Sequence, residues 1–263
     1  MILDAIVDEK RRVHATRDAA ADRGARDRIA AAAPVRSLKA ALRPTGRVPA
    51  VIAEFKRRSP SAGAIRDGGD AVAIAREYAA AGAAALSILT DEKFFGGSLA
   101  DVTAVRAAVD LPVLRKDFVL FEEDLVDARL AGADAVLLIV RLLDDALLGA
   151  LLGAAAALGL DALVEVHAES ELRRALDCGA RLVGINHRDL DTLAINIGLS
   201  EELAYLLPDD VVAVAESGLR TGDDVRWMGE TGYDAVLVGE SLLRADSPGA
   251  ALQAMLDGAA RSR

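Results

Sequence analysis

The chain has 263 residues, 52% of them hydrophobic, which is enough for one large domain with a sizeable core. Its formal net charge of −10 argues against nucleic acid and against anionic membranes as general partners. The single cysteine, Cys178, excludes an internal disulfide framework and fits a reducing compartment.

The N-terminal apolar run lacks the pattern of a secretory signal, because Asp4, Asp8 and Glu9 interrupt it. The most apolar stretch, residues 146–160, is shorter than the roughly 20 residues that a membrane span needs. We therefore expect a buried helix there, and a soluble protein of the cytoplasm.

The first 47 residues precede any strand and form a predicted helical extension. The periodicity favours a helix from Leu3 to about Ala21, and further helices around Ile29 and at Leu38–Leu42. Periodicity alone does not say where these helices pack.

A repeated pattern follows the extension, in which helix-sized segments alternate with short apolar runs. Four of the runs come after Gly82, Gly132, Gly179 and Gly232, at intervals of 50, 47 and 53 residues. Glycine after a helix suits a left-handed C-terminal cap. A continuous apolar run suits a parallel strand that is buried on both faces.

Eight strands result from this reading of the chain. They are predicted at 50–55, 83–89, 112–115, 133–139, 162–166, 180–186, 211–215 and 233–239, with helices such as 72–81, 99–109 and 122–131 between them. Strict alternation with eight strands predicts an α/β fold, the (β/α)8 TIM barrel, as a single domain over 1–263 that includes the extension 1–47. An open doubly wound sheet is the alternative, but no Gly-rich dinucleotide turn follows the first strand.

Charged and polar residues gather at the carboxyl ends of these strands, where barrels hold their active sites. They are Glu54, Lys56, Lys116, Glu165, Asn186, Arg188 and Glu216. Only five lysines occur against 26 arginines, and two of the five lie here. A lysine can release its proton when burial or a cationic neighbour lowers its pKa, whereas arginine effectively cannot. The pattern favours proton-transfer chemistry over a purely structural ion-pair network.

Three turns rich in serine and glycine lie at the same rim. They are residues 59–63 after the first strand, 216–218 after the seventh and 239–241 after the eighth. Barrels often bind phosphate with backbone N–H groups of the last two loops and a short helix N-terminus. The sequence therefore predicts a sugar-phosphate site.

Seven blocks of sequence, in order, resemble the signature of indole-3-glycerol-phosphate synthases. They are Val51–Ser61, Leu89–Ser98, Pro112–Phe118, Leu163–His167, Gly184–Leu190, Glu216–Gly218 and Val238–Leu242. Ile2–Val7 also resembles the first helix of that family, so the resemblance runs from residue 2 to about 245. His187 departs from the second asparagine that the family pattern suggests.

This resemblance implies a TIM barrel whose N-terminal extension caps the barrel mouth. The implied reaction is ring closure of 1-(o-carboxyphenylamino)-1-deoxyribulose 5-phosphate with loss of carbon dioxide and water, without metal or organic cofactor. Lys116 would be the general acid that protonates the ribulose carbonyl, and Glu165 would transfer a proton during dehydration. Lys56, positioned by Glu54, would neutralise anionic groups of the substrate.

The resemblance also assigns the remaining candidate residues. Asn186 and Arg188 match positions that hold a hydroxyl and the carboxylate of the substrate, and Glu216 matches a catalytic glutamate. Phe95 and Phe118 would line the pocket for the aromatic ring. The implied phosphate contacts are Ser59, Ser217, Gly218, Gly239 and Glu240. The only partner expected is this small sugar phosphate, bound by a monomer or a weak homodimer.

Two other functions fit the fold. A phosphoribosyl isomerase would also bind a sugar phosphate, but such enzymes usually use an acid/base pair that often includes Asp or Cys. A barrel that only binds a phosphorylated metabolite would not need Lys56, Lys116 and Glu165 together.

Overall fold

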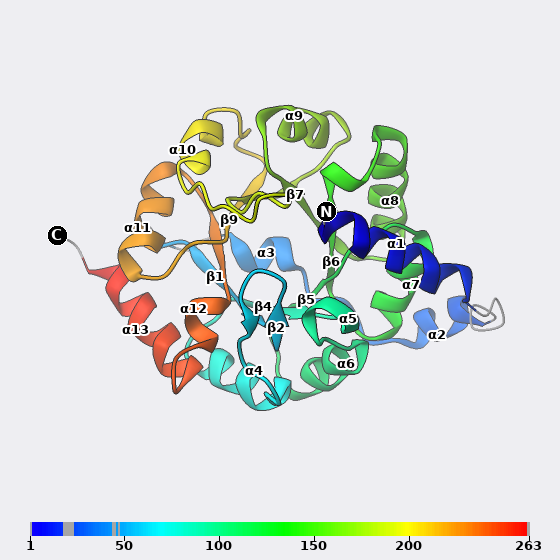
Figure 1. The fold of residues 1–263 in the computed structure, drawn as a ribbon, viewed down its shortest axis with the longest axis horizontal. Coiled ribbons are helices and arrows are strands. Elements are labelled where there is room, and N and C mark those ends of the chain that lie inside the picture. Colours follow the sequence, from blue (N-terminus) through cyan, green and yellow to red (C-terminus); the bar gives the residue numbers. More distant parts are fainter. Residues whose placement is uncertain (1, 18–23, 44–45, 47, 262–263) are drawn as a thin grey trace.

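Eight parallel strands close into a barrel in the order β1-β10-β9-β8-β7-β6-β5-β4, and helices surround the ring (Figure 1). The computed structural model describes residues 2–17, 24–43, 46 and 48–261. The predicted (β/α)8 barrel is confirmed, and the open-sheet alternative is wrong because β1 pairs with both β10 and β4.

The strands lie where the apolar runs predicted them. The barrel consists of β1 (Ala50–Phe55), β4 (Ala85–Leu89), β5 (Val113–Lys116), β6 (Ala135–Ile139), β7 (Asp161–Val166), β8 (Leu182–Asn186), β9 (Val212–Glu216) and β10 (Ala235–Val238). A short antiparallel hairpin of β2 (Arg58–Ser59) and β3 (Gly63–Ala64) follows β1. The sequence indicated only a turn there, because two-residue strands carry no periodic signal.

The helices occupy the segments between strands and the extension. They are α1 (Ile2–Ala15), α2 (Ala25–Ala31), α3 (Leu38–Leu42), α4 (Ala71–Ala80), α5 (Glu92–Phe95), α6 (Leu99–Ala108), α7 (Glu122–Leu130), α8 (Asp145–Ala157), α9 (Glu169–Asp177), α10 (Leu199–Ala204), α11 (Gly222–Thr231), α12 (Glu240–Leu243) and α13 (Pro248–Ala260), with a 3-10 turn η2 (Val140–Leu142). The four repeat glycines all adopt positive φ, from 87° to 103°, as the capping interpretation requires.

The pleat of each strand decides which side chains face the barrel axis. On β1, Ile52 belongs to the apolar cluster inside the barrel, and Glu54, two residues later, shares its face nearer the carboxyl end. On β5, Leu114 and Lys116 are related in the same way. Aliphatic side chains therefore fill the lower barrel, and charged side chains fill the layer above them.

The most apolar helix, α8, packs on the outside of the barrel. Its Leu148, Leu151 and Ala155 are fully buried, whereas residues such as Ala146 and Ala156 are exposed. The predicted helix is confirmed, but only one of its faces is buried. Among the described residues, no helix is both long and apolar enough to cross a membrane.

The N-terminal extension reaches both ends of the barrel, not only the mouth. At the mouth, α1 is held by an ion pair of Lys10 with Asp117 at 2.5 Å and by stacking of His14 on Phe121, with ring centroids 3.6 Å apart. The helix ends at Ala15, earlier than predicted, and residues 18–21 of the predicted helix lie outside the described residues.

At the opposite end, α3 closes the barrel floor and lies within the ring in Figure 1. Leu38 and Leu42 are fully buried in the apolar cluster of the barrel interior. The Ser37 hydroxyl and the Lys39 backbone N–H donate to Asp161 at the start of β7, at 3.0 and 2.9 Å. The extension is therefore part of the barrel core as well as part of its entrance.

Replacing Leu38 with alanine should lower the free energy of unfolding by about 3 kcal/mol, because it leaves a cavity in a fully packed floor. Urea denaturation would measure this change. Val13→Ala, at a side chain that is 52% exposed, is the matched control and should change stability little. A loss below about 1 kcal/mol for Leu38→Ala would show that the floor does not depend on this side chain.

Candidate active site

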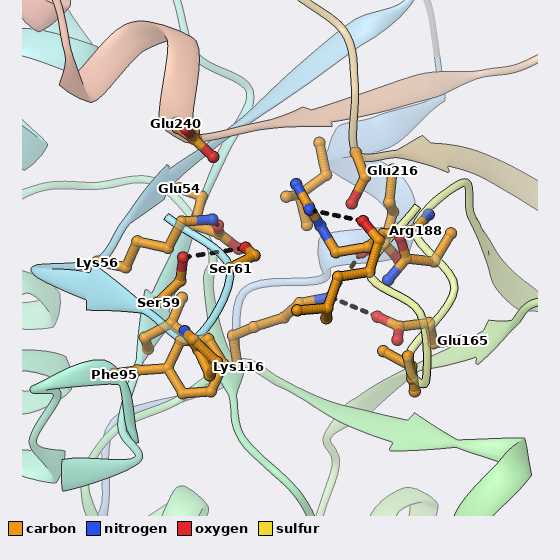
Figure 2. A pocket seen from close by; sticks show the side chains of 18 of the residues that line it. Glu54, Lys56, Ser59, Ser61, Phe95, Lys116, Glu165, Arg188, Glu216 and Glu240 are labelled. Carbon is orange, nitrogen blue, oxygen red and sulfur yellow. Dashed lines mark hydrogen bonds and ion pairs between the residues drawn. The ribbon is translucent and has the colours of Figure 1, made fainter. Parts of the chain in front are cut away.

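A cavity of about 600 Å³ opens at the carboxyl ends of the barrel strands (Figure 2). All fourteen candidate residues line it, and they come from seven of the eight strand ends and the loops beyond them. They are Glu54, Lys56, Ser59, Phe95, Lys116, Phe118, Glu165, Asn186, Arg188, Glu216, Ser217, Gly218, Gly239 and Glu240. This places them around one space, while their individual roles stay predictions.

Lys116 lies at the centre of the charged layer. Its ammonium donates to Glu165 Oε2 at 2.7 Å and to Glu216 Oε2 at 2.5 Å. Both carboxylates are nearly inaccessible to solvent. Three strands thus converge on one buried cation, whose charge is compensated by two anions.

These contacts shift the pKa values of all three groups. Burial opposes the charge on Lys116, but Glu165 and Glu216 outweigh it and raise the lysine pKa. Burial likewise opposes ionisation of Glu165, but Lys116 and then His167 hold its pKa well below the usual range. For Glu216 burial prevails over Lys116 and raises the pKa to about 7.

The sequence left open the direction of any pKa shift at the lysines, and the structure shows that the pKa of Lys116 is raised. Its neighbours are anions, which favour the charged form, whereas burial alone or a cationic neighbour would have lowered the pKa. Lys116 therefore enters the reaction as a protonated donor. Glu216, with a pKa of about 7, is the carboxyl that can hold a proton near neutrality.

A second lysine–glutamate pair lies on β1 and just beyond it. The Lys56 ammonium donates to Glu54 Oε1 at 2.5 Å, and the Ser87 hydroxyl donates to the other carboxylate oxygen at 3.3 Å. Glu54 is thus fixed from both sides and can orient Lys56 towards the cavity, as Figure 2 shows.

Two glycines make room for these carboxylates. A Cβ on Gly184 of β8 would lie 2.0 Å from Glu216 Oε1, and a Cβ on Gly239 would lie 2.7 Å from Glu54 Oε1. Any side chain at either position would displace an active-site carboxylate. Substitutions at Gly239 would therefore disturb Glu54 as well as the phosphate rim.

One wall of the cavity is apolar and suits an aromatic ring. The rings of Phe95 and Phe118 lie with centroids 6.0 Å apart at an interplanar angle of 39°. Ile2, Leu3 and Ile6 of α1 also line the cavity. Sequence reasoning did not identify these three, because helical periodicity does not reveal which element an apolar face contacts.

The serine and glycine turns also line the cavity. Ser59 and Ser61 hydroxyls lie 3.3 Å apart, and the backbone N–H of Ala62 donates to Ser59 Oγ at 3.1 Å. Helix α12 begins at Glu240, whose carboxylate is paired with Arg244 at 3.0 Å. Because that carboxylate would repel an anion, Glu240 can offer a phosphate only its backbone N–H.

Two arginines and two serines of this lining were missing from the candidate set: Ser61, Arg220, Ser241 and Arg244. Arg188 was in the set, and its side chain donates to Leu193 O at 3.3 Å. Its backbone N–H donates to Asn186 Oδ1 at 3.0 Å, which fixes the loop after β8. Ser61 and Ser241 lie inside the predicted turns 59–63 and 239–241, and the signal for Arg220 and Arg244 was their place after β9 and β10.

His167 lies directly behind Glu165. Its Nε2 is 3.3 Å from Glu165 Oε1 and its Nδ1 is 3.3 Å from Glu171 Oε2, while Arg141 Nε donates to the other Glu171 oxygen at 3.1 Å. An imidazole ring between two carboxylates can donate to both only when both ring nitrogens carry a proton, that is, in the charged form. Burial opposes the charge, but Glu165 and Glu171 raise the pKa of His167 to about 9.

This shift makes a prediction about stability. Folding raises the pKa of His167 from 6.5 to about 9, so its stabilisation is complete below pH 6.5 and is lost as the pH rises to 9. Urea denaturation should show a loss of up to about 3 kcal/mol across this range. His167→Gln should flatten that slope. An unchanged slope in the variant would mean that His167 is neutral in the folded chain.

Comparison with known proteins places this chain in a family. Residues 3–255 match the family model described as indole-3-glycerol phosphate synthase. An indole-3-glycerol phosphate synthase of Opitutus terrae is 54% identical over 213 residues, covering 79% of this chain and 80% of the relative. Indole-3-glycerol phosphate synthase 1 of Streptomyces coelicolor is 46% identical over 248 residues, covering 94% of this chain and 91% of the relative.

Among solved structures, a thiamine phosphate pyrophosphorylase from Pyrococcus furiosus matches with a TM-score of 0.61 and 17% identity, covering 84% of this chain and 96% of that one. At this identity the match shows a shared fold alone. The family model and the curated relatives carry the assignment, and the chain belongs to the indole-3-glycerol phosphate synthase family.

Proposed function

We propose that this cavity closes the indole ring of 1-(o-carboxyphenylamino)-1-deoxyribulose 5-phosphate, and that the lining residues divide the work as their positions allow. Family membership supports the reaction. The observation that supports the division of roles is the buried Lys116 ammonium held between Glu165 and Glu216.

The two halves of the cavity fit the two ends of this substrate. The aromatic ring would lie by Phe95 and Phe118, with its carboxylate towards the Arg188 guanidinium. The phosphate would lie at the rim formed by Ser59, the loop 217–218 and the start of α12. Lys56, between these ends, would balance their negative charge.

In the first step the aromatic carbon that bears the carboxylate attacks the ribulose carbonyl carbon. The new C–C bond converts the carbonyl oxygen to a hydroxyl, which takes its proton from Lys116. Carbon dioxide then leaves, and the electron pair of its bond restores the aromatic ring. Glu165 and Glu216 offset the positive charge that the attack creates on the ring system.

In the last step the hydroxyl departs as water and the second ring gains its double bond. The leaving oxygen takes a proton from an ammonium of the mouth, from Lys116 or Lys56. Glu165, ionised because of Lys116 and His167, accepts the proton that the indoline loses. Glu216, with its pKa of about 7, can return a proton to Lys116 for the next cycle.

The rival functions account for less of the site. A phosphoribosyl isomerase would have no use for the apolar slot of Phe95 and Phe118. A barrel that only bound a metabolite would bury Lys116 between two carboxylates without need. We also propose a cytoplasmic monomer or weak homodimer, with which the free thiol of Cys178 is consistent.

Lys116→Ala should lower kcat by at least about 100-fold, the usual contribution of general acid catalysis. The rise in indole fluorescence on mixing with the carboxyphenylamino-deoxyribulose phosphate measures the rate. Lys39→Ala removes a lysine from the barrel floor and is the control, which should retain the wild-type rate. A near-normal rate in Lys116→Ala, with folding shown by circular dichroism, would contradict the assignment of the acid.

A further inference from the structure

His187 lies behind the wall of the cavity, between two residues that line it. Asn186 and Arg188 reach the cavity, whereas the His187 ring is buried among β8, β9 and α10. The alternation of side chains at the end of β8 explains this arrangement. His187 therefore has no access to the substrate and can act only through its neighbours.

Two short hydrogen bonds hold the imidazole. Nδ1 lies 2.7 Å from the carbonyl oxygen of Ser217, and Nε2 lies 2.6 Å from the hydroxyl of Ser200. A carbonyl can only accept, so Nδ1 carries the proton, and the neutral ring accepts the Ser200 O–H at Nε2. Burial lowers the pKa of His187, which agrees with a neutral ring. Tyr233 fixes Ser200 in turn by donating to its carbonyl at 3.1 Å.

The Ser217 carbonyl belongs to a backbone segment with an unfavourable conformation. Ser217 has a φ of 70°, in the left-handed region that residues other than glycine rarely adopt, and Gly218 follows with a φ of 83°. In a planar trans peptide the C=O and the following N–H point in opposite directions. With the Ser217 carbonyl turned outward to His187, the Gly218 N–H points inward.

The Gly218 N–H lacks a hydrogen-bond acceptor, because none of the described residues accepts a hydrogen bond from it. Gly218 also lines the cavity, in the loop where we propose that the phosphate binds. A backbone N–H that points into the cavity at this position can donate a hydrogen bond to a phosphate oxygen.

We propose that His187 is a positioning residue for the phosphate of the substrate. By holding the Ser217 carbonyl outward, it fixes the peptide between Ser217 and Gly218 so that the Gly218 N–H faces the phosphoryl oxygens. This inference rests on the proposed function, because it takes the phosphate to bind at this rim. It gives His187 a specific task in binding and none in the chemical steps.

Two variants separate the two ring nitrogens. The amide nitrogen of Asn in His187→Asn can replace Nδ1 and keep the bond to Ser217. The longer side chain of His187→Gln places its amide near the position of Nε2, so it reaches Ser200 but leaves the Ser217 carbonyl free. His187→Asn is therefore the matched control for His187→Gln, because it keeps the bond to Ser217 that His187→Gln loses.

The expected result is a change in binding without a change in turnover. His187→Gln should raise KM, and the Kd for inorganic phosphate measured by calorimetry, by about tenfold, the effect of one hydrogen bond to a charged group. Its kcat should stay within about twofold of the wild type. His187→Asn should keep both binding constants close to those of the wild type. For the dephosphorylated substrate, kcat/KM should be the same in all three proteins.

Equal losses in both variants, or an unchanged phosphate Kd in His187→Gln, would overturn the inference. If His187→Gln fails to fold, His187→Leu, which has no hydrogen-bond donor for the Ser217 carbonyl, tests the same contact, and an unchanged phosphate Kd in that variant would overturn the inference equally. The calorimetry needs no turnover. A wild-type chain that binds phosphate but forms no indole would contradict the proposed function, whereas turnover with no effect of His187→Gln would contradict only this inference.

Discussion

In each barrel strand every second side chain points towards the barrel axis. Because the eight strands form a closed ring, their eight rows of inward-facing side chains meet around that axis. The row that carries Ile52 on β1 also carries Glu54, and the row of Leu163 on β7 also carries Glu165. The register that packs the interior thus aims the charges as well. A slip of one residue in any strand would move its aliphatic and its charged side chains out of the barrel together.

The charges of this layer have to balance because its carboxylates are nearly inaccessible to solvent. Three carboxylates, of Glu54, Glu165 and Glu216, face two ammonium groups, of Lys56 and Lys116. The raised pKa of Glu216 relieves the excess of negative charge by favouring its neutral form. A substrate that brings a carboxylate and a phosphate adds further anions, which the cations and N–H donors of the lining have to offset.

Much of this arrangement follows from sequence patterns, for reasons that can be stated. Continuous apolar runs and capping glycines have strong local signals, so the barrel and the strand ends were predictable, and with them the residues that meet at the mouth. Tertiary contacts have no such signal. The placement of α3 in the floor and the contact of His187 with the Ser217 carbonyl depend on partners that are distant in the chain. His167 contacts Glu165 and Glu171, which are near it in the chain, but no local pattern indicates that their side chains meet its ring.

The direction of the pKa shift at Lys116 could not be predicted either, for a related reason. Sequence shows which residue types reach the strand ends, but the sign of a pKa shift depends on which neighbours lie within a few ångströms. Lys116 meets two carboxylates and no cation at that distance among its described contacts. The direction of such a pKa shift therefore depends on the neighbours that the folded barrel brings together.

The position of α1 has a practical consequence for anyone who handles this protein. Because Ile2 lines the cavity, a peptide or domain fused ahead of it would begin at the substrate entrance. The other end of the described chain follows α13 on the outer ring of helices, away from the mouth (Figure 1). An affinity tag or a surface tether belongs at the carboxyl end, where it leaves the entrance open.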